Sequence, residues 1–319
     1  MDLQYPTDPA SQTQWILAQR PQRKELDPDK PYAYFVDEEC SATGEVVSVA
    51  TIFLTNRECP WRCVMCDLWK NTLTRPVAPG SIPRQIAYAL ERLPLARQVK
   101  LYNSGSFFDP AAIPREDYAG VAAELGFAAN VVVESHPGLI GAQAARLRDL
   151  LTGGLEVAMG LETAHEKVLG LLNKGFDLAQ FARASSRLRR ERISIRAFLL
   201  VNPPFMAPGE ALDWVVKSAD FAFSCGATAV SLIPTRAENG AMERLLESGE
   251  FALPNLADLE VAQSRAIALG KGRVFADIWD LKQFSRCEHC FEKRLERLQC
   301  VNLAQQDLPP VSCRNCGDT

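Results

Sequence analysis

Strand-like apolar runs alternate with helical segments along most of this 319-residue chain. Such alternation predicts an α/β fold of βαβ units with a parallel sheet, and six or seven units indicate a barrel or partial barrel. In that architecture the functional groups lie at the carboxyl ends of the strands. The predicted strands are Val47–Leu54, Gln98–Tyr102, Ala129–Val133, Leu155–Met159, Ile193–Val201, Ala229–Ile233 and Arg273–Ile278.

Two further segments flank the predicted barrel, which covers residues 47–284. Residues 1–46 read as an N-terminal extension, in which Tyr32–Val36 is a strand that can pair with the first barrel strand as a hairpin. After residue 284 the strand signals stop and cysteines cluster. Residues 285–319 are therefore predicted to be a small C-terminal cysteine-rich metal-binding segment.

The net charge of −4 gives no general reason to expect binding to nucleic acid. Arginines gather between Arg183 and Arg196, a pattern typical of a solvated helix face but also of a local basic stripe. No apolar run reaches the roughly 18 residues of a membrane span, and the N-terminus has no signal-like region. We therefore expect a cytoplasmic protein without membrane contact, whose ten cysteines are metal ligands rather than disulfides.

Three cysteines follow the first predicted barrel strand with the spacing Cys-x3-Cys-x2-Cys, at Cys59, Cys63 and Cys66. Soft thiolates suit iron, so three of them in eight residues can hold three corners of an iron–sulfur cubane. The run has no fourth cysteine. One iron is then left without a local protein ligand, which makes it a place for chemistry.

Polar or charged residues stand in or directly after nearly every predicted strand. A charge buried there is costly unless it is paired or bound to a ligand, so the group predicts a polar cavity over the barrel mouth. The polar or charged members of this group are Asn103, Ser104, Glu134, Glu162 and Arg196, and the glycines Gly105 and Gly160 stand beside them. Further residues are candidate substrate contacts by position alone: Asn202, Arg236, Asn239, Trp279 and Asp280.

Together these features resemble the radical S-adenosylmethionine (SAM) superfamily over about residues 47–280. The resemblance implies a partial (β/α)6 TIM-like barrel with a 4Fe–4S cluster on the three cysteines and SAM on the free iron. It implies an oxygen-sensitive enzyme that cleaves SAM reductively to a 5′-deoxyadenosyl radical, which abstracts hydrogen from an unidentified small-molecule or nucleoside-derived substrate. A one-electron donor such as flavodoxin or ferredoxin is implied as a partner.

The same resemblance implies contacts to the adenine and to the amino group of SAM. Met65, before the third cysteine, takes the position whose backbone meets the adenine. The second strand ends in Asn103-Ser104-Gly105, where the family often has a Gly-Gly-Glu-type motif with an acid for the amino group. Asn103 or a backbone carbonyl is the implied replacement for that acid.

The resemblance also implies contacts to the ribose and to the carboxylate of SAM. Gly160 and Glu162 match the motif near the ribose, and Glu134 is a second candidate for the ribose hydroxyls. Arg196 is implied as the partner of the methionine carboxylate, because a guanidinium fork matches a carboxylate in shape and charge.

Within the superfamily, the chain is similar to the radical SAM subunit of archaeosine synthase, its uncharacterised bacterial relatives and the elongator-like group. The stretches that carry this likeness are 55–59, 66–69, 101–105 and 160–163. It implies an alternative function, a subunit that modifies transfer RNA together with a partner protein. The acidic composition and the lack of a recognisable RNA-binding module do not favour that substrate.

Two Cys-x2-Cys pairs near the end of the chain form a second group: Cys287, Cys290, Cys313 and Cys316. Their ribbon-like spacing favours a structural zinc ion on four thiolates. An auxiliary iron–sulfur cluster, with Cys300 as an alternative ligand, and a disordered tail with free thiols are the other interpretations. If both cysteine groups held structural zinc, the chain would be a non-enzymatic metal-binding module.

Overall fold

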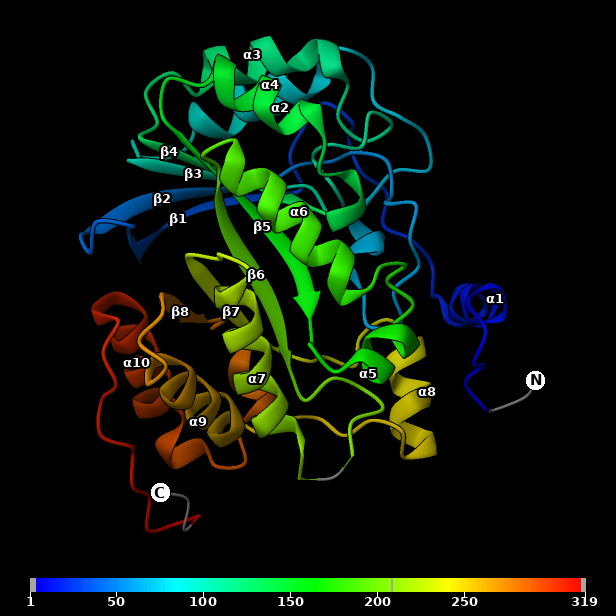
Figure 1. The fold of residues 1–319 in the computed structure, drawn as a ribbon, viewed down its shortest axis with the longest axis vertical. Helices are drawn as coiled ribbons and strands as arrows, with labels where there is room; N and C mark the ends of the chain where they lie inside the picture. Colours follow the sequence, from blue (N-terminus) through cyan, green and yellow to red (C-terminus); the bar gives the residue numbers. More distant parts are fainter. Residues whose placement is uncertain (1–3, 208, 317–319) are drawn as a thin grey trace.

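The computed structural model describes residues 4–207 and 209–316 (Figure 1). Within these residues, eight strands form one sheet in the order β1-β2-β3-β4-β5-β6-β7-β8. The pair β1–β2 is antiparallel, and each later pair is parallel. The strands are β1 (Ala33–Cys40), β2 (Val46–Phe53), β3 (Gln98–Tyr102), β4 (Asn130–Ser135), β5 (Gly154–Glu162), β6 (Ser194–Val201), β7 (Ala229–Pro234) and β8 (Arg273–Ala276).

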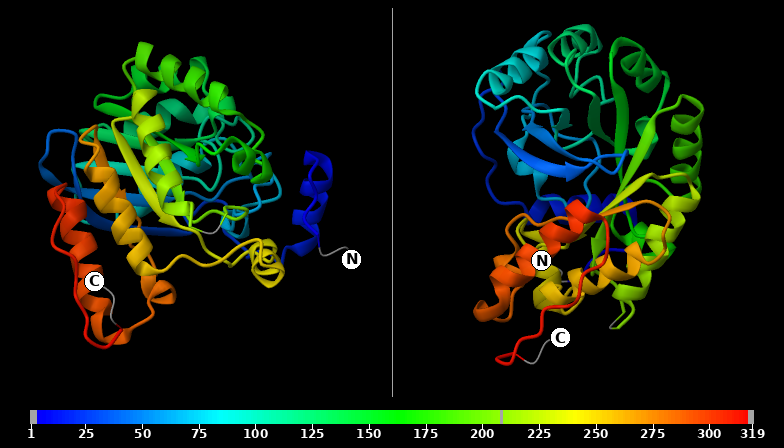
Figure 2. Two further views of the ribbon diagram at one scale, coloured as in Figure 1. Left: turned by 60° about the horizontal axis from the view of Figure 1, so that its bottom comes forward. Right: turned by 90° about the vertical axis from the view of Figure 1, so that its left-hand side faces the viewer.

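The connecting helices lie mainly on the outer face of the curled sheet (Figures 1 and 2). The α-helices are α1 (Pro9–Gln19), α2 (Ser81–Leu90), α3 (Tyr118–Glu124), α4 (Ala142–Leu150), α5 (Glu166–Leu171), α6 (Leu178–Arg190), α7 (Ala211–Ser224), α8 (Ala241–Ser248), α9 (Leu256–Ile267) and α10 (Glu288–Ala304). Short 3-10 helices are η1 (Leu68–Asn71), η2 (Arg115–Asp117), η3 (Pro137–Leu139) and η4 (Leu281–Phe284). No described helix is long and apolar enough to cross a membrane.

The two faces of each strand have different neighbours because successive side chains point to opposite sides. In β3, Val99 and Leu101 belong to the main hydrophobic core, which packs between the sheet and the outer helices. Lys100 and Tyr102 therefore point to the inner side, which we call the lumen. The same alternation in β6 sends Ile195 to the core and leaves the neighbouring residues for the lumen.

Ion pairs across the lumen show how strongly the sheet curls. Arg196 of β6 donates to Glu39 of β1 through Nη1 (2.9 Å) and Nη2 (2.6 Å), although four strands separate β1 from β6. Lys100 Nζ lies 2.6 Å from Glu39 Oε2, and Arg196 Nε lies 2.6 Å from Glu156 Oε1. These groups, with Arg273 bound to Glu156 at 3.0 Å, form a buried network that we call the lumen floor.

Side chains also connect β1 and β8, the first and last strands of the sheet. Arg273 Nη1 donates to the carbonyl oxygen of Cys40 at 3.1 Å. Just above, the rings of Trp279 and Phe35 stack with centroids 6.0 Å apart. Cys40 packs with Phe275 in a small buried cluster, so its thiol belongs to the wall of the barrel.

The structure confirms the predicted partial α/β barrel and the hairpin at its start. The sheet is wider than the implied six-stranded barrel because β8 adds a seventh parallel strand and β1 an antiparallel one. Helix α10, which lies beside β8 and β1, was not anticipated from the sequence. The sequence of this helix is rich in charged residues and only weakly amphipathic, so no periodic apolar pattern indicated a helix there.

Candidate functional site

The first cysteine group lies in the loop that follows β2 at the carboxyl end of the sheet, here called the cysteine loop (residues 54–67). The loop backbone is tied to the next segment, since Glu58 N donates to the carbonyl of Leu73 at 3.0 Å. Cys66 N donates to the carbonyl of Cys63 at 3.2 Å, which closes a tight turn between these two ligand candidates. All three cysteines are partly buried and form no disulfide.

Burial raises the pKa of each thiol in the cysteine loop. For Cys59 the pKa rises to about 12, with the neighbouring Cys63 adding to the effect of burial. The pKa values of Cys63 and Cys66 are also raised, chiefly by burial. The thiols are therefore protonated at neutral pH unless a metal binds, because only the thiolate form is a ligand and metal binding releases the thiol proton.

Trp61 fixes the cysteine loop against the rest of the barrel mouth. Its ring stacks on that of His136 with centroids 3.4 Å apart and planes at 12°. A Cβ on Gly175 would lie 2.6 Å from this indole, and Gly175 has a φ of +73°, so both contact and backbone require glycine. His136 donates from Nε2 to the Lys174 carbonyl (2.8 Å) and accepts at Nδ1 from Gly138 N (3.0 Å).

The role of His136 is accordingly structural in this arrangement. Burial lowers its pKa to about 3, with the nearby ammonium of Lys174 as a smaller cause. A neutral imidazole is what its two hydrogen bonds require, because one ring nitrogen donates and the other accepts.

Asn239 holds the cysteine loop from the opposite side. Its Nδ2 donates to the carbonyl oxygens of Val64 (2.7 Å) and Cys66 (3.0 Å), and its Oδ1 accepts from Met242 N (2.8 Å). These bonds use both donors and one acceptor position of the amide, and the side chain is buried. Asn239 therefore positions the loop of the candidate ligands, and its predicted contact with substrate stays a prediction.

The segment after β3 packs directly against the cysteine loop. A Cβ on Gly105 would lie 3.3 Å from Cβ of Cys59, so a larger residue would press on the first cysteine. Glu134, at the end of β4, accepts from the backbone N–H groups of Asn103 and Gly105. Burial raises the pKa of Glu134 to about 7, although these N–H groups act in the opposite direction. Ser104 Oγ lies 2.9 Å from the Tyr32 hydroxyl.

The side-chain amide of Asn103 is buried without a partner. The residue is 0% exposed, and neither Nδ2 nor Oδ1 has a hydrogen-bond partner within the described residues. Buried polar groups in native proteins are satisfied in the great majority of cases, so such an amide indicates a bound group or ordered water. It stands next to the cysteine loop, at the position predicted to meet the amino group of SAM.

Lys174 is a residue of this site that the sequence analysis missed. Its Nζ lies 2.6 Å from Oε1 of Glu162, and both side chains are almost fully buried. Burial alone would lower the pKa of Lys174, but Glu162 and then Cys63 raise it, so the ammonium is retained. A Cβ on Gly160 would lie 2.4 Å from Glu162 Oε1 and 2.6 Å from Lys174 Nζ. The glycine of the predicted motif therefore leaves room for this ion pair.

A local sequence signal for Lys174 exists in the segment Asn173-Lys174-Gly175. A lysine between an asparagine and a glycine follows a short helix that begins just after the Gly160–Glu162 motif. A turn of this kind, at the end of a barrel unit, can place a side chain at the barrel mouth.

Arg196 does not fit its predicted role. It is the third residue of β6, near the amino end of the strand, and its guanidinium is held in the lumen floor by Glu39 and Glu156. The prediction rested on the presence of an arginine in this strand and did not consider how far along the strand the arginine lies. Because the carboxyl ends carry the cysteine loop, Arg196 is a structural cation at the opposite end of the lumen.

The other predicted positions lie around the mouth. Arg236 donates to Asp277 (3.2 Å) and to the carbonyl of Trp279 (2.6 Å), which brings the segments after β7 and β8 together. Trp279 is 66% exposed, and Asp280 follows it with a φ of +46°. Asn202 Nδ2 donates to the carbonyl of Ala252 at 2.6 Å, so this amide serves a loop contact. Met65, a residue of the cysteine loop itself, packs against a small apolar cluster that includes its neighbour Val64.

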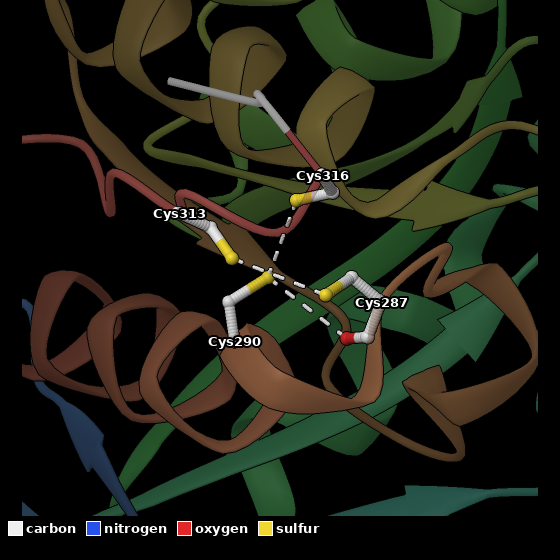
Figure 3. A group of neighbouring side chains, drawn as sticks. All are labelled: Cys287, Cys290, Cys313 and Cys316. Carbon is white, nitrogen blue, oxygen red and sulfur yellow. Dashed lines mark hydrogen bonds between the residues drawn. The ribbon is translucent and has the colours of Figure 1, made fainter.

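The second cysteine group converges as the sequence predicted. The sulfurs of Cys287, Cys290, Cys313 and Cys316 all lie within 4.8 Å of one another and point to a common centre (Figure 3). Helix α10 supplies Cys290 in its first turn, and the last described residues bring the other pair alongside. The Sγ atoms of Cys287 and Cys313 are 3.9 Å apart, as are those of Cys290 and Cys316.

Comparisons with known proteins identify relatives that extend over most of the chain. No protein-family model matches it. An uncharacterized protein of Methanocaldococcus jannaschii is 26% identical over 325 residues, covering 92% of this chain and 87% of that protein. Archaeosine synthase subunit beta of Methanosarcina acetivorans is 24% identical over 290 residues, covering 85% of this chain and 83% of the subunit.

The solved structure of Elp3 from Methanocaldococcus infernus shares the fold with a TM-score of 0.51 at 14% identity. The match covers 69% of this chain and 59% of the Elp3 chain. The chain is thus similar in sequence to archaeosine synthase subunit beta and similar in fold to Elp3. The predicted likeness to archaeosine synthase and to elongator-like proteins is thereby confirmed.

Most of the contacts that the radical SAM resemblance implies are brought together by the fold. Asn103, Gly105 and Glu134 lie beside the cysteine loop. Glu162 joins them through Lys174, whose ammonium is close enough to Cys63 and Cys66 to interact with their thiolate forms. The resulting mouth has thiols on one side, an unpartnered amide beside them and one buried ion pair.

Proposed function

We propose that the chain is a radical SAM enzyme, with a 4Fe–4S cluster on Cys59, Cys63 and Cys66. The observation that carries this proposal is the unpartnered, fully buried amide of Asn103 beside a loop of three cysteines. A fourth protein thiolate is not part of that loop, which leaves one metal position for a ligand from outside. When bound, the cluster supplies the electron that cleaves SAM to methionine and a 5′-deoxyadenosyl radical.

Each residue of the mouth has a chemical task in this proposal. Asn103 accepts a hydrogen bond from the SAM amino group, and the carboxylate of Glu134 adds negative charge behind the same backbone segment. Lys174 replaces Arg196 as the cation for the methionine carboxylate, because its ammonium is buried near the cysteine thiols. Glu162 keeps that ammonium in place and remains the candidate for the ribose, while the backbone of Met65 remains the candidate for the adenine.

The lumen is the proposed place of the substrate. Half-buried rings line it: Phe53 contacts Tyr102 with centroids 5.8 Å apart, and Tyr102 reaches Phe198 of β6 at 6.0 Å. Phe35 and Trp279 continue this lining to the rim. The lumen floor closes the far end with paired charges. Aromatic rings beneath the mouth limit the access of water, which protects a reactive radical from side reactions.

The direct test is anaerobic reconstitution with iron and sulfide, followed by dithionite and SAM. The parent is expected to form 5′-deoxyadenosine, and Cys63→Ala is expected to form none. Lys174→Met is expected to weaken SAM binding, measured by equilibrium dialysis, while iron and sulfide content stay at the parent level. A Cys63→Ala variant as active as the parent would refute the proposal.

For the four C-terminal cysteines we propose a structural zinc ion. Tetrahedral zinc with Zn–S bonds of about 2.3 Å places its sulfurs about 3.8 Å apart. The Cys287–Cys313 and Cys290–Cys316 sulfur–sulfur separations of 3.9 Å match that spacing. A cubane spreads its four cysteine sulfurs around a larger body, so the auxiliary-cluster alternative is less well supported. Metal analysis that found one zinc per chain in a Cys63→Ala background would support the zinc assignment.

A second candidate function is that of a transfer-RNA-modifying subunit. It is supported by the relatives named archaeosine synthase subunit beta, a name that also implies a partner subunit. Of the basic stripe, Arg196 is buried in the lumen floor, whereas the other members are exposed on α6 or just after it: Arg183, Arg187, Arg189, Arg190 and Arg192. Salt-sensitive binding of transfer RNA that is lost on removing these exposed arginines would favour this function.

A further inference from the structure

A cavity of about 350 Å³ lies directly outside the cysteine loop and separate from the lumen. Arg57, Glu58, Pro60 and Arg62 of the loop itself form much of its wall, and Arg23 and Asp109 close it. None of the lining residues belongs to a barrel strand, so a ligand there does not enter the lumen. We call this cavity the arginine pocket.

The charges around the arginine pocket are fixed in an unbalanced arrangement. The single carboxylate of Glu58 is shared by Arg20 (2.7 Å), Arg23 (2.6 Å) and Arg62 (3.3 Å). Three guanidinium groups against one carboxylate leave a surplus of positive charge, and the shared ion pairs hold these side chains in place.

Arg57 adds a further charge that is not neutralised. Its side chain is exposed and forms no ion pair with any residue from 4–207 or 209–316. Counting Arg57 and the carboxylate of Asp109, four arginines face two acids, a local charge of +2 on a chain whose net charge is −4. A compact positive patch on an acidic protein favours a compact acidic partner.

The position of the patch indicates what such a partner would do. Arg62 donates to the backbone carbonyls of Cys59 and Trp61, so the patch and the first cysteine share one short segment of chain. The proposed function needs one electron from outside, and this surface lies on the segment that carries the first candidate cluster ligand, Cys59. A polynucleotide would instead need positive charge spread along an extended path.

We propose that the arginine pocket is the docking surface for an acidic one-electron carrier protein of the flavodoxin class. The inference rests on the proposed function. In the docked complex the reduced carrier gives up one electron and the oxidised cluster gains it, and no covalent bond forms or breaks. The acidic side chains of the carrier pair with Arg57 and with the exposed parts of Arg23 and Arg62, whose guanidinium groups Glu58 holds in place.

The experiment compares Arg57→Glu with Arg183→Glu, a matched charge reversal at another exposed arginine, which lies on α6 and has no ion pair within the described residues. Reduced flavodoxin is the probe, and its affinity for each cluster-loaded protein is measured by titration calorimetry at low and high salt. Arg57→Glu is expected to weaken binding about tenfold at low salt, with a smaller loss at high salt, and Arg183→Glu to have no effect.

A second measurement separates this inference from the proposed function. With dithionite as reductant, both variants are expected to form 5′-deoxyadenosine at the parent rate, whereas flavodoxin-driven formation falls about tenfold in Arg57→Glu. Failure of the parent with dithionite would refute the proposed function and leave the calorimetric comparison as the test of docking. The docking assignment would be overturned if the two variants bound flavodoxin equally well. It would also be overturned if Arg57→Glu lost transfer-RNA binding instead of flavodoxin binding.

Discussion

Replacing Glu39 by glutamine tests whether the buried ion network closes the barrel. Glu39 accepts from Arg196 at 2.9 and 2.6 Å and from Lys100 at 2.6 Å, and all three side chains are buried. After the substitution, Lys100 loses its paired carboxylate, and Arg196 keeps only the one of Glu156, which it shares with Arg273. Removal of one partner from a buried ion pair costs about 3–5 kcal/mol, because the remaining charge is left uncompensated.

The matched control is Glu38→Gln, one residue earlier on the same strand but exposed. Urea unfolding followed by circular dichroism, with both variants at equal metal content, measures the difference. With a slope of about 3 kcal/mol per molar urea, the expected loss lowers the midpoint of Glu39→Gln by about 1–1.7 M. The midpoint of Glu38→Gln is expected to stay near that of the parent, since exposed charges contribute little. Equal midpoints for the two variants would refute the role assigned to the lumen floor.

The same pair of variants has a predicted pH dependence. Burial alone would raise the pKa of Glu39, but Arg196 and Lys100 outweigh burial and hold it below its ordinary value of 4.5. The unfolded chain therefore binds this proton more readily than the folded chain, and the stabilisation is complete above pH 4.5 and lost as the pH falls below it. In Glu39→Gln, the loss of stability below pH 4.5 is expected to be shallower than in the parent or in Glu38→Gln.

Three further predictions concern the mouth and the C-terminal centre. Gly175→Ala is expected to lose about 1–3 kcal/mol more stability than Gly249→Ala, which has a similar positive φ but no atoms within 4 Å, because the new methyl group strikes Trp61; equal urea midpoints would contradict this. Because the pKa of Glu134 is raised to about 7, SAM affinity is expected to rise as the pH passes through 7 and this carboxylate ionises beside the SAM ammonium; Glu134→Gln should give a flat profile in equilibrium dialysis. Cys290→Ser is expected to lower bound zinc well below one per chain and to increase proteolysis near the C-terminus, with Cys225→Ser as the unaffected control.

The features that the sequence determined by itself are local ones. Side-chain alternation with a period of two and turn residues between segments predicted the strands and the hairpin, because both depend on a few neighbouring residues. The spacing of Cys59, Cys63 and Cys66, and of the two C-terminal pairs, predicted metal ligands for the same reason. Convergence of the second group required only that two short segments meet.

What the tertiary structure decided is the use of each polar side chain. Arg196, Glu162 and Asn239 are all polar residues in or after strands, yet one closes the floor, one pairs with Lys174 and one holds the cysteine loop. These uses depend on depth along a strand and on the curl that brings β6 opposite β1. Such distances join residues far apart in the chain, so no local pattern encodes them, whereas the cysteine spacing carries its chemistry within a single loop.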